Sequence, residues 1–136
     1  MARISEALYV LREYAQRLVK HEVNVSDLLV SKRLSKRPSE YKHDVFQAVT
    51  ARQLLDAGFD VYPGQNVQYL IVDADSKRVY NRVRAAQLLG SKLKFDVEKY
   101  LELLISSADT LFNVFGYDYK RIHSYVLNQE KQAVLS

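Results

Sequence analysis

Three histidines and a pair of aspartates are the first candidates in this sequence for metal binding or catalysis. His21, His43 and His123 stand far apart, in none of the spacings that place two imidazoles beside one metal ion. Asp73 and Asp75 could pair around a divalent ion, but they fall in a predicted hairpin turn, where aspartate is common because it bonds its own backbone. The four glycines, at positions 58, 64, 90 and 116, form no phosphate loop, dinucleotide fingerprint or nucleophile elbow. We therefore predict no catalytic residue and no metal ligand.

Lysine and arginine are concentrated in two stretches of the chain. Residues 31–42 carry a net charge of +4 and residues 77–95 carry +6, whereas the whole chain carries +4, so that the remainder carries −6. Serines lie among the cations of the first stretch, and both kinds of side chain donate hydrogen bonds to phosphate oxygens. This pattern predicts a surface for a polyanion, first of all the backbone of a nucleic acid, although composition alone also allows solvated loops whose charges only maintain solubility. The predicted DNA-binding residues are Ser31, Lys32, Arg33, Ser35, Lys36, Arg37, Lys42, Arg78, Arg82 and Arg84.

The size and composition of the chain are those of an ordinary folded domain. It has 136 residues, of which 48% are hydrophobic and 26% charged, enough for one compact unit with its own core. There is no cysteine, which excludes disulfides and thiolate metal sites and fits an intracellular protein. No apolar run approaches the length of a membrane span. We expect a cytoplasmic, nucleoid-associated protein without a membrane partner.

Hydrophobic periodicity predicts three helices. Apolar residues recur at spacings of three and four over residues 4–20 and again over residues 96–115. A face of small residues predicts a shorter helix over residues 45–57, with Gly58 as the left-handed residue after its end. Asp96 can cap the start of the last helix.

Extended structure is predicted between the helices. We expect an extended segment over residues 23–34 and, after the turn at Pro63-Gly64, a strand over residues 67–72 with a hairpin partner over residues 78–83. The expected fold is α+β, helices with a small antiparallel hairpin or sheet. Residues 1–116 should form the folded domain and residues 117–136 a C-terminal tail.

Six short motifs follow one another in an order that resembles a known family. They are residues 28–34 (LLVSKRL), Tyr41, residues 48–58 (AVTARQLLDAG), residues 62–72 (YPGQNVQYLIV), residues 96–100 (DVEKY) and residues 115–117 (FGY). Together they resemble the thumb, the C-terminal domain of family B DNA polymerases, most closely those of archaea. The chain departs from the family at Gln47, where a histidine usually precedes the alanine-rich helix.

The resemblance implies a function of holding DNA without catalysing its synthesis. In such polymerases the thumb wraps the primer–template duplex and contacts phosphates and the minor groove, and the resemblance places residues 31–34 on its duplex-facing segment. The assignment of Arg78, Arg82 and Arg84 depends mainly on charge. The palm motifs of the D-x-x-S-L-Y and Y-G-D-T-D types are absent from this sequence. We therefore expect no cofactor in this chain, with Mg²⁺ held by a partner palm chain, and expect either an excised domain or the small chain of a split polymerase.

Two further interpretations concern protein partners. Residues 132–135 match the first half of the sliding-clamp motif of these enzymes but lack its aromatic anchors, so we expect weak clamp binding or none. The alternative function is that of a protein-interaction subunit whose basic face binds an acidic protein partner. A small hydrolase or metal enzyme ranks last, since only scattered histidines and aspartates favour it.

Overall fold

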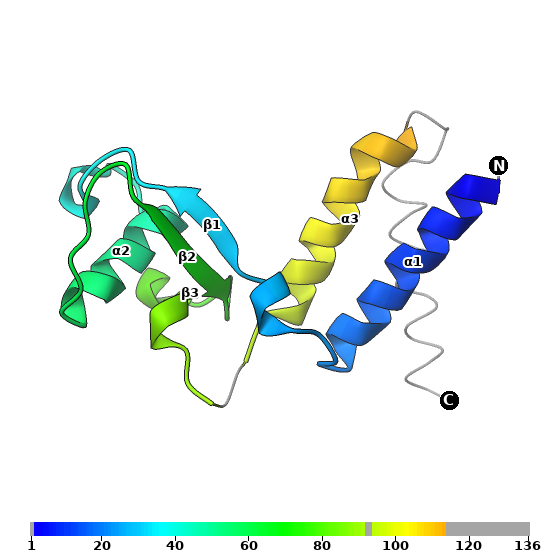
Figure 1. Cartoon of the computed structure of the whole chain (residues 1–136), viewed down its shortest axis with the longest axis horizontal. Coiled ribbons are helices and arrows are strands. Elements are labelled where there is room, and N and C mark those ends of the chain that lie inside the picture. The colour runs from blue at the N-terminus through cyan, green and yellow to red at the C-terminus, as the bar shows by residue number, and fades with distance from the viewer. Residues whose placement is uncertain (1, 92–93, 114–136) are drawn as a thin grey trace. The chain divides into compact units, whose positions relative to one another are not determined.

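The structure, a computed structural model, describes residues 2–91 and 94–113 (Figure 1). The chain divides into two compact units, and each is described by itself. Unit 1 contains helices α1 (Ala2–Val19) and α3 (Val97–Asn113). Unit 2 comprises residues 24–96 and contains a three-stranded sheet and helix α2 (Phe46–Asp56). The prediction of an α+β fold with a small antiparallel sheet is confirmed.

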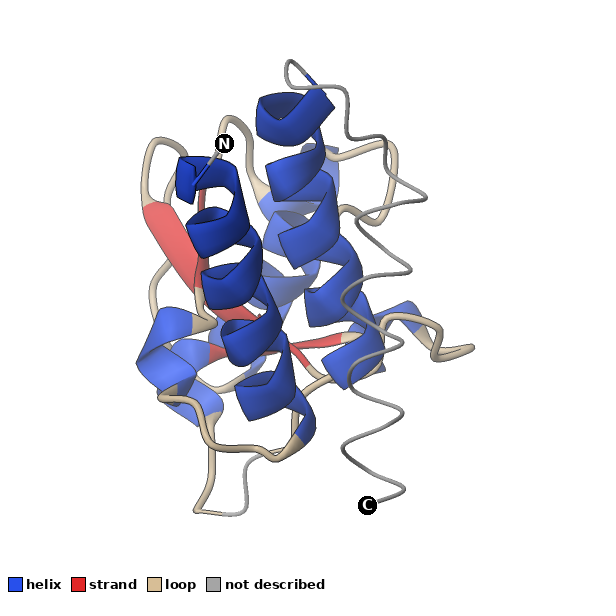
Figure 2. Ribbon diagram, turned by 90° about the vertical axis from the view of Figure 1, so that its right-hand side faces the viewer, coloured by secondary structure: helices blue, strands red, loops and turns tan. Residues whose placement is uncertain are grey.

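Helices α1 and α3 lie side by side and bury their apolar stripes against each other (Figure 2). The buried residues are Leu8, Leu11, Ala15 and Leu18 in α1 and Tyr100, Leu101 and Ile105 in α3. Both helices were predicted from this periodicity, although Phe115 and Gly116 lie outside the described residues.

His21 takes part in the ending of α1. Its φ is +58°, and the flanking amides bond back into the last turn, His21 N–H to Leu18 O and Glu22 N–H to Arg17 O. This pairing is the Schellman motif, in which one left-handed residue satisfies the last helical carbonyls. His21 therefore has a structural role at a helix end.

The sheet of unit 2 has the strand order β1-β2-β3 and is antiparallel throughout. The strands are β1 (Val30–Arg33), β2 (Asn66–Ile71) and β3 (Val83–Ala85). Helix α2 covers one face, where its Ala51 and Leu54 pack against Val67 of β2 and Ala85 of β3. Leu34, fully buried, completes this core.

The connections of unit 2 confirm some predictions and correct one. Gly58 and Gly64 have φ values of +91° and +90°, so both predicted turn glycines adopt the left-handed backbone that other residues avoid. The predicted hairpin partner over residues 78–83 is wrong for most of its length, because Val79–Asn81 forms a 3₁₀ turn and β3 starts only at Val83. The carbonyl of Arg82 accepts bonds from Val72 N–H and Asp73 N–H, which draws the chain into a compact loop before pairing resumes.

The first half of the predicted extended segment also contains a 3₁₀ turn, over Val25–Asp27, before β1 begins. None of the helices within residues 2–91 and 94–113 is long and apolar enough to cross a membrane.

Candidate nucleic-acid interface

The face of the sheet opposite α2 is polar. Residues paired across antiparallel strands point to the same side, and successive residues of a strand point to opposite sides. Because Val67 and Ala85 point toward α2, the other face consists of Ser31 and Arg33 from β1, Asn66, Gln68 and Leu70 from β2, and Arg84 from β3. All of these are exposed except Leu70, which is fully buried. We call Ser31, Arg33, Asn66, Gln68 and Arg84 the polar sheet face.

This arrangement places an arginine on each outer strand, with Asn66 opposite Arg33 and the buried Leu70 opposite Arg84. Arg33 pairs with Asn66 and Ser31 with Gln68, so donors from two strands stand opposite each other. Arg84 comes from the opposite edge of the sheet. The sequence prediction did not include Asn66 and Gln68 as binding residues. Their alternation with the apolar Val67 and Tyr69 was the signal that they point away from the core.

Lys32 lies on the other side of β1 from Arg33. It pairs with Val67, whose side chain points toward α2, yet Lys32 is exposed because β1 is an edge of the described sheet. The predicted motif of residues 31–34 is thus divided by the pleat: Ser31 and Arg33 belong to the polar sheet face, Lys32 lies at its rim, and Leu34 is in the core.

Tyr41 holds the loop that follows β1. Ser35 N–H donates to the Tyr41 hydroxyl at 3.0 Å, and the two hydroxyl oxygens are 3.4 Å apart. The ammonium of Lys36 lies 5.8 Å from the centre of the Tyr41 ring, within reach of a cation–π contact. The hydrogen bonds with Ser35 lower the pKa of Tyr41 from its ordinary value. Tyr41 therefore orders the loop that presents Ser35 and Lys36, while Arg37 and Lys42 are exposed beyond it.

The three arginines of the second basic stretch have different surroundings. Arg78 is exposed just before the 3₁₀ turn. The Nε of Arg82 donates to Ser76 O at 2.8 Å, so this half-buried side chain holds the turn after β2. Arg84 is exposed on β3, and its charge opposes a rise in the pKa of nearby Tyr80 that burial and the hydrogen bond to Asp56 produce. Of the three, Arg84 alone belongs to the polar sheet face.

Gln53 of α2 fixes the strand that carries Arg84. Its Nε2 donates to Val83 O and Tyr80 O, and its Oε1 accepts from Ala85 N–H, each at 2.8 Å. The side chain is 1% exposed, and it satisfies backbone groups at the outer edge of β3 that another strand would otherwise have to bond. The signal of this role in the sequence was a glutamine among the small and apolar residues of a predicted helix.

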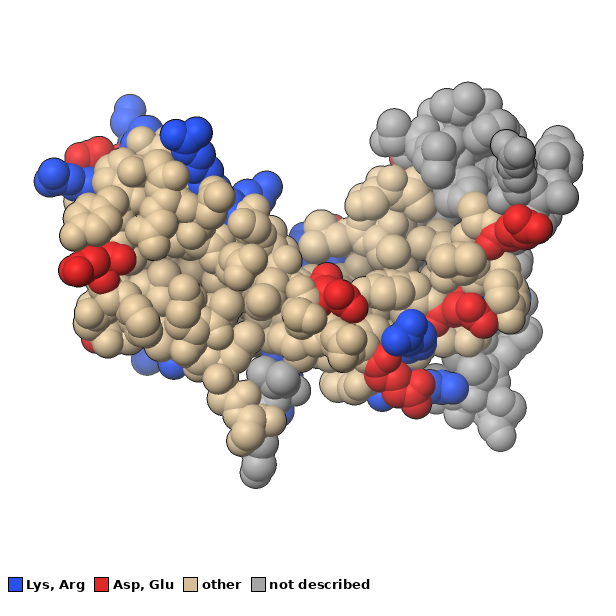
Figure 3. All heavy atoms as spheres, viewed as in Figure 1, with Lys and Arg blue, Asp and Glu red and all other residues tan. Residues whose placement is uncertain are grey.

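The charged side chains of unit 2 are unevenly distributed over its surface. In Figure 3 lysine and arginine side chains gather along the border of unit 2 that carries β1 and the loop after it. The exposed cations of that segment are Lys32, Arg33, Lys36, Arg37 and Lys42.

The described part of the chain contains no group of three His, Cys, Asp or Glu side chains placed to hold a metal ion. Asp73 and Asp75 lie in the predicted turn, where Ser76 N–H bonds to Asp73 O at 3.1 Å. His123 and the clamp-like residues 132–135 lie outside the described residues.

Comparison with known proteins identifies the family. The features available for this comparison are an α+β unit with a cationic border and a polar sheet face. Residues 2–115 match the family model of DNA polymerase family B, and the chain belongs to that family. The family named from its six motifs is therefore confirmed.

The relatives are much longer than this chain. It is 22% identical to the DNA polymerase of Thermococcus sp. (strain 9oN-7) and 24% identical to that of Pyrococcus glycovorans, in each case over 115 residues, 84% of this chain and 15% of the relative. The solved family B DNA polymerase of the hyperthermophilic archaeon Pyrobaculum calidifontis matches with a TM-score of 0.64 and 30% identity, over 74% of this chain and 13% of that one. The chain thus spans between 7% and 15% of the length of the curated relatives it matches.

Proposed function

We propose that this chain is the thumb portion of a family B DNA polymerase and grips primer–template duplex without catalysing synthesis. The observation that carries the proposal is the polar sheet face, which combines Arg33 and Arg84 with exposed amide and hydroxyl groups. The size of the match supports a single functional part of a polymerase, since the chain corresponds to 13% of the solved relative.

The side chains of this face suit reading of the DNA backbone. Guanidinium groups pair with phosphates through charge and paired hydrogen bonds, and Ser31, Asn66 and Gln68 can donate to phosphate or minor-groove acceptors. The proposed face is formed by short strands and not by a helix that could enter the major groove and contact base edges. Binding should therefore depend little on sequence, as suits a protein that follows a growing duplex.

Catalysis is assigned to a partner. The proposed partner is a polymerase palm, in the same polypeptide or on a separate chain, that holds Mg²⁺ with its own aspartates, and we propose no cofactor for the residues described above. The palm would polymerise nucleotides while the thumb portion retains the duplex.

The dependence of duplex affinity on salt tests the proposal. If Arg33 and Arg84 of this face and Lys32, Lys36 and Lys42 of the border beside it neutralise phosphates, about five cations in all, the logarithm of the association constant should fall against the logarithm of salt concentration with a slope of about −4 to −5. Fluorescence anisotropy with a labelled primer–template at several NaCl concentrations measures this slope. Duplexes of unrelated sequence serve as controls and should bind alike. A slope near zero, or no duplex binding at low salt, would rule out gripping and favour an acidic protein as the partner.

A further inference from the structure

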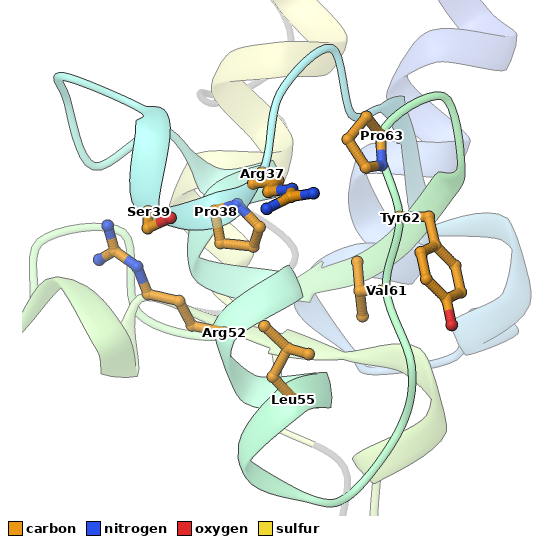
Figure 4. A pocket seen from close by; sticks show the side chains of 8 residues that line it. All are labelled: Arg37, Pro38, Ser39, Arg52, Leu55, Val61, Tyr62 and Pro63. Atoms are coloured by element: carbon orange, nitrogen blue, oxygen red, sulfur yellow. The ribbon is translucent and has the colours of Figure 1, made fainter.

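A pocket of about 470 Å³ opens beside α2 in unit 2 (Figure 4). Its walls come from three segments: residues 37–39, the exposed side of α2, and residues 61–63 before β2. The volume lies within the range of sites that bind small molecules or peptide side chains. Arg37, predicted from the sequence to contact DNA, is one of the lining residues.

The pocket combines apolar walls with positive charge. Leu55 and Tyr62 line it and remain 45% and 64% exposed, while Val61 and the prolines on either side supply further apolar surface. No acidic residue is among those that line it. Arg52 is paired with Asp44 at 3.0 Å, whereas no carboxylate within the described residues lies at salt-bridge distance from Arg37. The fitting occupant therefore carries both an apolar group and an anionic group.

Local bonds hold the two loops that form the walls. Pro38 is buried, and Glu40 N–H donates to Arg37 O at 2.9 Å, which closes a short turn. On the opposite wall Tyr62 N–H donates to Gln65 Oε1 at 3.1 Å, and Pro63 has a restricted φ. Walls held in this way reduce the entropy lost on binding.

The position of the pocket distinguishes it from the proposed DNA surface. Arg52 and Leu55 belong to α2, and α2 covers the side of the sheet opposite the polar sheet face. A duplex on that face leaves the pocket accessible. Half of the lining residues are aliphatic or proline and only Tyr62 is aromatic, whereas unpaired bases bind mainly by stacking on aromatic rings. These features favour a peptide over a nucleotide.

We propose that this pocket binds a short peptide segment of a partner protein that contains both acidic and large apolar side chains. The apolar side chains lie against Leu55, Val61 and Tyr62, and a carboxylate pairs with Arg37. Phe59 lies in the sequence between α2 and the wall formed by residues 61–63. It is 45% exposed and adds to the apolar surface of this segment. This binding does not depend on the proposed grip on DNA.

Amide NMR of the full ¹⁵N-labelled chain tests the proposal with defined probes. The first probe is the heptapeptide acetyl-Asp-Glu-Leu-Leu-Asp-Phe-Glu-amide. A second replaces its apolar residues by serine, and a third replaces its acids by asparagine and glutamine. We expect the first probe alone to shift amides of residues 37–39, 52–55 and 61–63 in a saturable manner. Equal shifts from the acid-only probe would overturn the proposal, because charge alone would then explain them.

Two variants and a matched control examine the contacts. Arg37→Glu and Leu55→Ser should each weaken binding of the first probe by about tenfold or more, with an unchanged spread of amide signals showing that the fold persists. Lys20→Glu makes the same charge change at an exposed position in unit 1 and should leave binding unchanged. An equal loss with Lys20→Glu would contradict the proposal. So would stronger shifts of the pocket amides by a single-stranded oligothymidine, which would identify the pocket as a nucleic-acid contact.

Discussion

Arg33 and Arg84 reach one face of the sheet from strands at its opposite edges, and the central strand contributes Asn66, Gln68 and the buried Leu70 to the same face. The adjacent cation Lys32 points to the other side of β1, so charges that are neighbours in the sequence have different positions relative to a bound duplex. Because Arg33 and Lys32 point to different sides of β1, single substitutions can measure the contribution of each to duplex binding.

Replacing Arg33 tests its proposed contact with phosphate. Arg33→Gln should weaken binding to all duplex sequences alike and reduce the steepness of the salt dependence by about one unit, because one fewer counterion is released. The measurement is the anisotropy titration described above. Lys20→Gln removes an exposed cation of unit 1 and is the matched control. A loss confined to one DNA sequence would contradict backbone reading.

Tyr69 should make the fold sensitive to alkali. Its ring is 4% exposed and packs edge-on against Phe46 with centroids 5.8 Å apart, and burial raises the pKa of its hydroxyl above the ordinary 10. The unfolded chain loses this proton near pH 10, while the folded chain still holds it. The contribution to stability is therefore present below about pH 10 and is lost as pH rises through the folded pKa.

Tyr69→Phe keeps the ring and removes the titrating group. Between pH 8 and about pH 10.5 this variant should lose less free energy of unfolding than the unmodified chain, as measured by urea denaturation. Tyr62→Phe changes an exposed tyrosine and provides the comparison. If the two variants lose stability equally, burial of Tyr69 is not the cause.

Among the elements, α2 and β3 pack together and are also hydrogen-bonded through the side chain of Gln53. Gln53 bonds Val83 and Ala85, the backbone neighbours of Arg84 on either side, and thereby sets where Arg84 stands. The helix thus acts on the polar sheet face although it covers the opposite one.

Gln53→Leu should destabilise the chain by about 3 kcal/mol, because buried backbone groups lose their partners. It should also weaken duplex binding, but only while Arg84 is present. In a double-mutant cycle, Gln53→Leu in the Arg84→Ala background should therefore cost little further DNA affinity. Gln47→Leu, the same change at a half-buried position on α2, serves as control and should have a smaller effect on stability. Equal losses of DNA affinity with and without Arg84 would show that Gln53 acts on the fold alone.

At the scale of the whole molecule, the net positive charge comes entirely from unit 2. Residues 24–96 contain twelve lysines and arginines and eight aspartates and glutamates, so they account for the entire charge of +4 and leave the rest of the chain neutral. All ten candidate DNA-binding residues lie in this unit. Its C-terminal end is secured by bonds from Asp96 N–H to Ile71 O and from Ala74 N–H to the Asp96 carboxylate.

We expect residues 24–96 to fold without the remainder of the chain and to bind duplex. Their own core should give a cooperative urea transition, and their salt slope should equal that of the full chain within about one unit, since the same cations are present. Circular dichroism and anisotropy measure the two properties. A folded fragment that no longer binds duplex would assign the grip to unit 1.

Much of the fold was predictable from local patterns. The helices around residues 4–20 and 96–115 follow from their apolar stripes, and the turns at Gly58 and Gly64 follow from a backbone conformation that glycine tolerates best. The start of β3 was not predictable, because the loop before it depends on bonds to the Arg82 carbonyl from Val72 and Asp73 at the other end of that loop.

The sequence by itself determined the periodic helices, the alternating strand, the two basic stretches and the family. These depend on spacing and composition along the chain. The tertiary structure alone decided that Ser31, Arg33 and Arg84 share a face while Lys32 does not, that Gln53 completes the edge of β3, and that Arg37 meets Leu55 in a pocket. Each of these depends on the pairing register of the strands or on contacts between residues far apart in sequence. Shifting the register by a single residue would exchange the two faces of the sheet.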